Sequence, residues 1–169
     1  MTGHLLQLQK ISEHLQSERR EILEHAQSLV DVYWFSFTNQ NREIAQRIKS
    51  GLTQEDINNI APVIETRSHT GSPVVKVYII WKLHSKKFRN NMKKAAKTNA
   101  SLPIHPYTSE DARAALKKHC TWNLNMALEL ERQLIDIRTT LGAVHESHKR
   151  IIAGIRKLER QLQKETKHE

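Results

Sequence analysis

The sequence predicts an α+β protein in which two long amphipathic, coiled-coil-like terminal helices pack around a small antiparallel β-hairpin or sheet. Three observations lead there. Apolar residues recur with helical heptad spacing near both ends of the chain, and a run rich in β-branched and aromatic residues lies between them. Only 38% of the residues are apolar and 5% aromatic, which is little for a large globular core. We therefore expect an N-terminal amphipathic helix in residues 1–37, a central α/β region in 38–120, and a long C-terminal heptad helix in 121–169.

The first helix is expected over residues 5–35. Its apolar positions are Leu8, Leu15, Ile22 and Leu29, seven apart, with Ile11 and Val32 on the interleaved positions. That interleaved row also holds the polar Glu18 and His25. The aromatic cluster of residues 33–37 and the Asn/Gln-rich residues 38–41 predict that the helix ends there. A shorter helix is expected over residues 41–50, stopped by Gly51.

The central region predicts a hairpin, because Pro62–Arg67 and Pro73–His84 are β-rich and flank a loop that contains Gly71. On the second strand, one face is expected to carry Val75, Val77, Ile79, Trp81 and Leu83, and the other to be a basic outer face with Lys76 and Lys82. Trp81 itself is expected in the core. Beyond an extended segment at residues 102–107, Thr108 or Ser109 is expected to cap a further helix.

The C-terminal helix is expected over residues 121–164, with Trp122 as a packing anchor that docks the start of the helix on the hairpin. Its seam positions alternate three- and four-residue steps, and all but His148 are apolar: Ala127, Leu130, Leu134, Ile137, Leu141, Val144, His148, Ile151, Ile155, Leu158 and Leu162. Such a seam needs a partner, and the N-terminal helix is the simplest one.

The C-terminal heptad pattern is longer than the N-terminal one, so the sequence predicts an unpaired seam end at Ile155, Leu158 and Leu162. Burying this end in a second copy predicts a homodimer. Its interface is expected to contain Leu141, Val144, His148, Ile151, Ile155, Leu158 and Leu162. Protonation of His148 within the seam is expected to weaken assembly as the pH falls.

The charge of the chain is concentrated in one stretch. The formal net charge is +9, and residues 82–119 hold ten Lys/Arg against two acids, a net of +8. Clustered like charges repel one another, so this stretch indicates a surface for a polyanion. The residues expected to bind nucleic acid are Lys76, Lys82, Lys86, Lys87, Phe88, Arg89, Lys93, Lys94 and Lys97. Lysines outnumber arginines, which favours backbone attraction over base reading, and no pattern decides between duplex, single strand and RNA.

Enzymatic chemistry is not expected. Cys120 and its neighbour His119 do not face each other on a helix, and no phosphate-binding glycine loop is present. Glu129, Glu131 and Asp136 are interpreted as ordinary exposed helix charges. His145 and His148 do not complete a zinc site, so no catalytic residue, metal or cofactor is predicted. The lone cysteine, the absence of a secretory signal and the lack of a ~20-residue apolar run predict a soluble, cytoplasmic protein without a membrane partner.

A resemblance sharpens the expected function. The aromatic pair Tyr33-Trp34, the Trp-ended strand Val77-Tyr78-Ile79-Ile80-Trp81, the basic stretch and the helix Trp122…Glu131…Leu134…Ile137-Arg138 follow one another in an order similar to MobI-type proteins of integrative conjugative elements and conjugative plasmids. The similarity spans roughly residues 20–140, and Asn123 stands where that pattern has an acid. It implies a DNA-binding mobilisation protein that acts at the origin of transfer and assists a relaxase in the relaxosome. The alternatives are a coiled-coil protein-interaction adaptor and an RNA-binding regulator.

Overall fold

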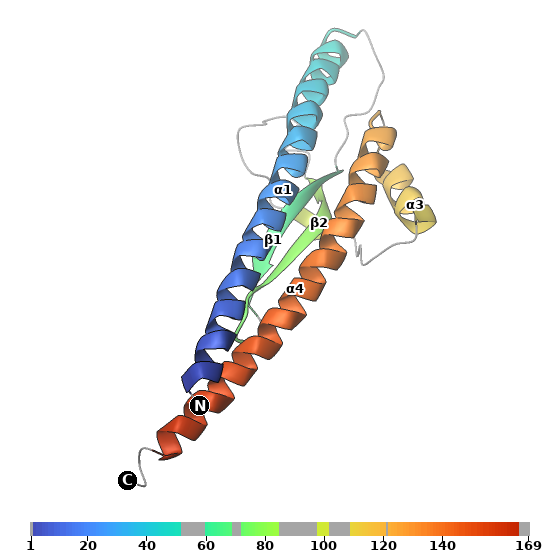
Figure 1. Ribbon diagram of the computed structural model, residues 1–169. Helices are drawn as coiled ribbons and strands as arrows, with labels where there is room; N and C mark the ends of the chain where they lie inside the picture. Colours follow the sequence, from blue (N-terminus) through green and yellow to red (C-terminus); the bar gives the residue numbers. More distant parts are fainter. Residues whose placement is uncertain are drawn as a thin grey trace. The chain divides into compact units, whose positions relative to one another are not determined.

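The computed structural model describes residues 2–51, 60–68, 72–84, 98–101, 109–120 and 122–165. In chain order the elements are α1 (Thr2–Lys49), β1 (Ile60–Arg67), β2 (Lys76–His84), β3 (Thr98–Ser101), α3 (Ser109–His119) and α4 (Leu124–Glu165), as shown in Figure 1. The three strands form one sheet in the order β1-β2-β3. The predicted α+β class, with long terminal helices and a small sheet, is confirmed.

Helix α1 is continuous over 48 residues, so the predicted helix end at residues 35–37 and the separate helix at 41–50 are wrong. Residues 38–50 contain neither Gly nor Pro, and Asn and Gln each cost at most ~0.7 kcal/mol in a helix. Gly51 ends the helix as predicted. Its φ of 68° is the left-handed conformation that glycine adopts freely, and its N–H donates to the carbonyl of Ile48 at 3.1 Å. The boundary expected at residue 37 therefore lies inside α1.

The buried side of α1 does not follow the predicted heptads throughout. Beyond residue 25, buried residues recur eleven apart: Ala26 and Phe37, Val30 and Asn41, Tyr33 and Ile44. Eleven residues make three turns of 3.67 residues, which is closer to a straight α-helix than the 3.5 of a heptad. The interleaved position Val32 is consequently exposed, with 69% of its surface accessible, and Ile11 in the first half of α1 is exposed as well.

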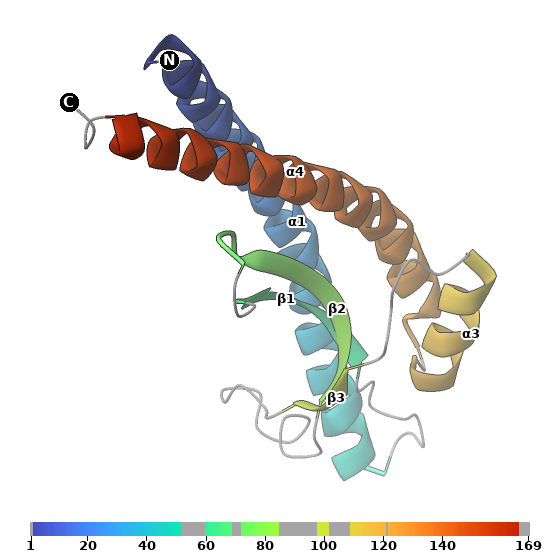
Figure 2. The ribbon, with the colours of Figure 1, turned by 90° about the horizontal axis from the view of Figure 1, so that it is seen from below.

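The chain forms two compact units, and the larger comprises Ala26–Glu65 and Tyr78–Asp136. Trp81 is fully buried there, as predicted, with its ring edge-on to Tyr33 at a centroid distance of 5.2 Å. The first strand is fastened to α1 by two hydrogen bonds. Tyr33 Oη donates to the carbonyl of Ile60 at 3.3 Å, and Trp34 Nε1 donates to the carbonyl of Pro62 at 2.7 Å. Figure 2 shows the strands beside this part of α1.

Strand β2 pairs antiparallel with β3, with Lys82 opposite Ser101 and a register irregularity between Leu83 and His84. The predicted alternation of faces holds only partly. Ile79 and Trp81 are buried, but Ile80 between them is buried too, so both faces of the strand are covered there. At the start of the strand Val75 is exposed, contrary to prediction.

The second unit comprises Met1–His25, Thr66–Val77 and Ile137–Glu169. In it, the first half of α1 and the second half of α4 run antiparallel, and Figure 1 shows them side by side. Ser12 Oγ and His148 Nε2 form a hydrogen bond of 3.0 Å, and a Cβ placed on Gly154 would lie 3.4 Å from Leu8 Cδ1. The N-terminal helix is therefore the partner of the C-terminal seam, as predicted.

Helix α4 begins at Leu124, three residues after the predicted start, and the amide of Ala127 donates to the carbonyl of Asn123 at 2.9 Å. The predicted seam is largely confirmed by its buried members: Ala127, Leu130, Leu134, Ile137, Leu141, Val144, His148 and Ile155. In the part of the chain that the structure describes, no helix has the length and apolarity to cross a membrane.

Candidate nucleic-acid interface

Most of the side chains predicted to bind nucleic acid lie outside the described residues. These are Lys86, Lys87, Phe88, Arg89, Lys93, Lys94 and Lys97. The two that the structure places, Lys76 and Lys82, lie on β2 in different units.

Lys82 is committed to an ion pair within the protein. Its Nζ binds Glu65 Oε1, and only 13% of its side chain is exposed. An ammonium in this position is neutralised by the carboxylate and has little surface left for a phosphate. We therefore correct its assignment from a nucleic-acid contact to a link between β1 and β2.

Helix α3 presents a basic surface that the residue-level prediction missed. Arg113, Lys117 and Lys118 are exposed, whereas Leu116 and Cys120 are buried in the core of the larger unit. At 100° per residue, Lys118 lies on the side opposite Leu116, and Arg113 and Lys117 lie one turn apart between the two sides. None of the three forms an ion pair with another described residue. Their positions within the +8 stretch were the available signal.

The potential at the end of α3 is positive. The pKa of His119 is lowered, first by burial and then by the charge of Lys118. Lys117, Lys118 and His119 form the last turn of the helix, where cations also suit the helix dipole. This end of α3 therefore carries two lysine charges beside a histidine that favours its neutral form.

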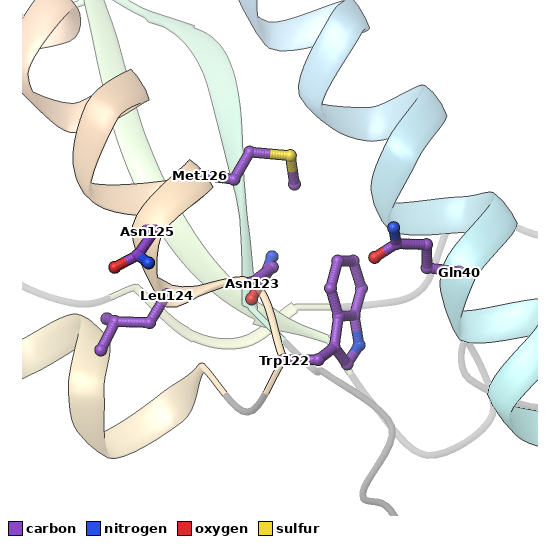
Figure 3. A pocket seen from close by; sticks show the side chains of 6 residues that line it. All are labelled: Gln40, Trp122, Asn123, Leu124, Asn125 and Met126. Carbon is purple, nitrogen blue, oxygen red and sulfur yellow. The ribbon is translucent and has the colours of Figure 1, made fainter.

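An open pocket of about 530 Å³ lies at the corner where α3 gives way to α4 (Figure 3). Its lining is Gln40, Trp122, Asn123, Leu124, Asn125 and Met126. The indole of Trp122 stands between Gln40 on α1 and the first residues of α4. Among the residues that the structure describes, no Lys, Arg, Asp or Glu lines this pocket, and the polar side chains of the lining include three amides.

Two hydrogen bonds hold the corner in place. Trp122 Nε1 donates to Oδ1 of the buried Asn41 at 3.2 Å, and Asn123 Nδ2 donates to Tyr33 Oη at 2.5 Å. The prediction of Trp122 as a packing anchor placed it on the hairpin, whereas the hydrogen-bond partner of its indole lies on α1. Asn41 sits in the segment that was expected to break the helix.

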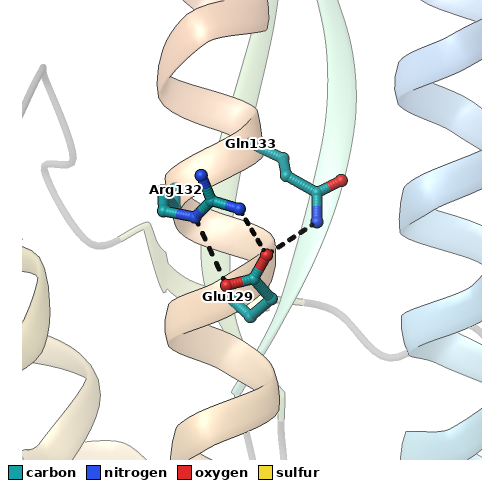
Figure 4. Close-up of polar contacts among 3 residues, drawn as sticks. All are labelled: Glu129, Arg132 and Gln133. Atoms are coloured by element: carbon teal, nitrogen blue, oxygen red, sulfur yellow. Dashed lines mark hydrogen bonds and ion pairs between the residues drawn. The ribbon is translucent and has the colours of Figure 1, made fainter.

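The acids of α4 differ from one another more than the sequence suggested. Glu129 is exposed, and Arg132 donates to it from Nε at 3.3 Å and from Nη2 at 2.7 Å, with a further bond from Gln133 (Figure 4). The hydrogen bond from Arg132 lowers the pKa of Glu129. Glu131 is only 1% exposed and accepts a 2.7 Å hydrogen bond from Trp81 Nε1. Its interpretation as an exposed charge was wrong.

The remaining reactive groups are protected. Cys120 is buried, and burial raises the pKa of its thiol to about 12, so it is a protonated thiol at neutral pH. Among the residues that the structure describes, no three His, Cys, Asp or Glu side chains are grouped to hold a metal ion.

The predicted oligomer interface is largely occupied within one chain. Leu141, Val144, His148 and Ile155 are buried, and Ile155 was expected to be exposed. The prediction rested on the longer heptad pattern near the C-terminus, but the N-terminal helix itself is the longer one, with 48 residues in α1 and 42 in α4. Of the predicted interface, Ile151, Leu158 and Leu162 keep partial exposure, and the homodimer prediction now depends on these three.

His148 and His145 give the seam of the smaller unit a polar centre. The pKa of His148 is lowered by burial and then by the charge of Arg19. That of His145 is lowered mainly by burial, against the opposing effect of Glu146. The Nδ1 atoms of both rings are buried without a hydrogen-bond partner in the described part of the chain. Protonating either ring therefore places a charge in the seam.

Comparison of the chain with protein-family models, with curated proteins and with solved structures finds no match. The candidate site consequently stands on its own residues: the basic surface of α3 and the amide-lined pocket beside it.

Proposed function

We propose that this chain is a DNA-binding accessory protein of conjugative transfer, which acts at the origin of transfer, assists a relaxase and does not cleave DNA itself. The observation that carries the proposal is the cationic stretch of residues 82–119 together with the exposed Arg113, Lys117 and Lys118 of α3. The resemblance to MobI-type proteins supplies the biological setting.

The charge pattern favours phosphate contacts over base reading. Lysines bind phosphates as point charges, and neutralising phosphates releases counterions. The logarithm of the DNA association constant is expected to fall linearly with the logarithm of salt concentration, with a slope of about −0.9 per duplex phosphate contacted.

The first test changes Lys86, Lys87, Arg89, Lys93 and Lys94 to Ala and measures binding to labelled duplexes by fluorescence anisotropy across salt. We expect weaker binding to all sequences alike and a shallower salt slope. Unchanged affinity, or salt-independent binding by the original protein, would contradict phosphate binding by this segment.

The second test asks whether the protein acts at the origin of transfer. DNA crosslinked to the protein in cells is recovered and sequenced, and the proposal expects a peak at one transfer-origin locus. Uniform coverage of the genome would contradict an action at the origin of transfer. Tighter binding to RNA than to origin DNA at equal salt would instead favour the RNA-binding regulator.

One observation favours the coiled-coil adaptor as a second candidate. Val32 and Phe35 on α1 are 69% and 71% exposed, and they lie three residues apart on one helix side. Exposed apolar side chains in proximity are typical of protein-binding surfaces. A protein that purifies without nucleic acid and gives no mobility shift with duplex or single-stranded DNA would move the preference to this function.

A further inference from the structure

We propose that the pocket at the α3–α4 corner binds an unstacked nucleobase of single-stranded DNA. The inference rests on the proposed DNA-binding function and adds a second mode of contact to it. Phosphates are assigned to the basic surface of α3, and a base to the pocket lined by Trp122 and the amides around it.

The indole of Trp122 is suited to stacking. Its only donor, Nε1, is already used by Asn41, and Asn41 is completely buried in α1. The orientation of the ring is thereby fixed before any ligand arrives. What the half-buried ring still offers is its π surface, and bases stack on such surfaces irrespective of their sequence.

The amides supply the polar half of base recognition. Gln40 and Asn125 are exposed, and neither side chain has a hydrogen-bond partner among the described residues. Each side-chain amide carries two donor hydrogens and an acceptor oxygen. It can therefore pair with both the acceptors and the donors on the edge of a base. The described lining residues carry no charged side chain, and the volume of about 530 Å³ lies within the range of small-ligand sites.

The distance from the basic helix fits a continuous strand. His119 ends α3 and Trp122 lines the pocket, so three peptide units separate them, at most ~11 Å between their Cα atoms. A base in the pocket and phosphates bound near the end of α3 can therefore belong to one short stretch of strand. A strand separated at a transfer origin has unstacked bases to offer, whereas an intact duplex has none.

The test measures binding of labelled oligo-dT, an oligomer of equal length with abasic positions, and a duplex. The variants are Trp122→Ala and the double variant Gln40→Ala/Asn125→Ala, which changes only exposed side chains. Loss of one stacked base is expected to weaken oligo-dT binding by roughly 5- to 150-fold in Trp122→Ala. The double variant is expected to bind oligo-dT more weakly as well. Duplex affinity and the salt slope should stay as in the original protein.

Fluorescence gives a second measurement in case Trp122→Ala does not fold. Oligo-dT should quench the tryptophan emission of the original protein and of Trp34→Phe, but the quenching should largely disappear in Trp122→Phe. Equal affinity of the original protein for oligo-dT and the abasic oligomer would overturn the base pocket while leaving phosphate binding intact. No binding to any of the three DNAs would overturn the proposed function itself. Tighter binding to an RNA of equal length than to oligo-dT would overturn the assignment to DNA.

Discussion

The two compact units of this chain are stabilised by different means. The smaller one, Met1–His25, Thr66–Val77 and Ile137–Glu169, contains an antiparallel helix pair with aliphatic residues around a Ser12–His148 hydrogen bond. The larger one contains all three tryptophans, and each indole N–H has a specific acceptor, on Pro62, Asn41 or Glu131. An aliphatic seam tolerates exchange of similar side chains, whereas a buried polar partner left without its bond is costly.

This difference suits the larger unit to carry the candidate site. The basic surface of α3 and the amide-lined pocket both lie in the larger unit, where directional hydrogen bonds fix side chains such as Trp122 in one orientation. Binding sites need such fixed groups. The helix pair is better suited to a structural or pH-sensitive role, because its polar centre consists of two buried histidines.

The largest effect is expected in the aromatic core. Replacing the fully buried Trp81 by Ala should lower the free energy of unfolding by about 3–5 kcal/mol, because it leaves a cavity and removes a donor from the buried Glu131. Phe35→Ala is the matched control, since this aromatic residue is 71% exposed and its loss should change stability by about 0.5 kcal/mol or less. Urea unfolding followed by circular dichroism compares them. Equal losses in the two variants would contradict the described core.

A smaller effect should distinguish the helix pair by its pH dependence. The folded pKa values of His145 and His148 are lowered, so the unfolded chain binds protons first as the pH drops. Stability from these groups is present above about pH 6.5 and is lost as the pH falls through the lowered folded pKa values. The double variant His145→Leu/His148→Leu should reduce the loss between pH 8 and 5. The pKa of His119 is also lowered, so its contribution to the loss of stability on acidification should remain in the double variant.

The exposed His25 of the same unit provides the control, and the double variant should lose less stability on acidification than His25→Leu. Urea unfolding at a series of pH values measures both variants. A double variant that loses as much stability on acidification as the original protein would show that the buried histidines do not control the helix pair.

The smallest effects concern two glycines. A Cβ added at Gly142 in α4 meets nothing within 4 Å, so Gly142→Ala should raise the free energy of unfolding by about 0.5–1 kcal/mol. Gly51→Ala should lower it by about 1 kcal/mol, because the φ of 68° strains any residue with a Cβ. Thermal unfolding of the two variants should show melting temperatures shifted in opposite directions. A shift of the same sign in both would contradict the described backbone at one of them.

The same contrast explains which parts of the fold could be predicted from the sequence. The seam of α4 follows three- and four-residue steps. A regular pattern of this kind identifies the buried face of the helix and indicates that the helix needs a partner. The buried side of α1 was misassigned because it changes to an eleven-residue repeat, and because Asn41 looked like a helix breaker. The buried Asn41 accepts a hydrogen bond from Trp122, which lies 81 positions later in the sequence.

Charges were the least predictable feature. Glu131 and Lys82 have the sequence neighbourhood of ordinary surface residues, and only the partners Trp81 and Glu65 give them their structural roles. Conversely, the predicted nucleic-acid contacts end at Lys97 and omit Arg113, Lys117 and Lys118, although the helical spacing around Leu116 is visible in the sequence. Contacts between residues far apart in the sequence decide which charges remain available for a ligand. The local spacing of residues does not reveal these contacts.

A pair of charge-matched variants tests whether the basic surface of α3 binds DNA phosphates. Arg113→Ala/Lys117→Ala/Lys118→Ala and the control Arg156→Ala/Lys157→Ala/Arg160→Ala each remove three exposed positive charges, the control from α4 in the smaller unit. If all three α3 side chains contact phosphates, the α3 variant should lose about 2.7 from the magnitude of the salt slope on duplex DNA, while the control keeps the original slope. Equal losses in the two variants, or no loss in the α3 variant, would contradict phosphate binding by this surface.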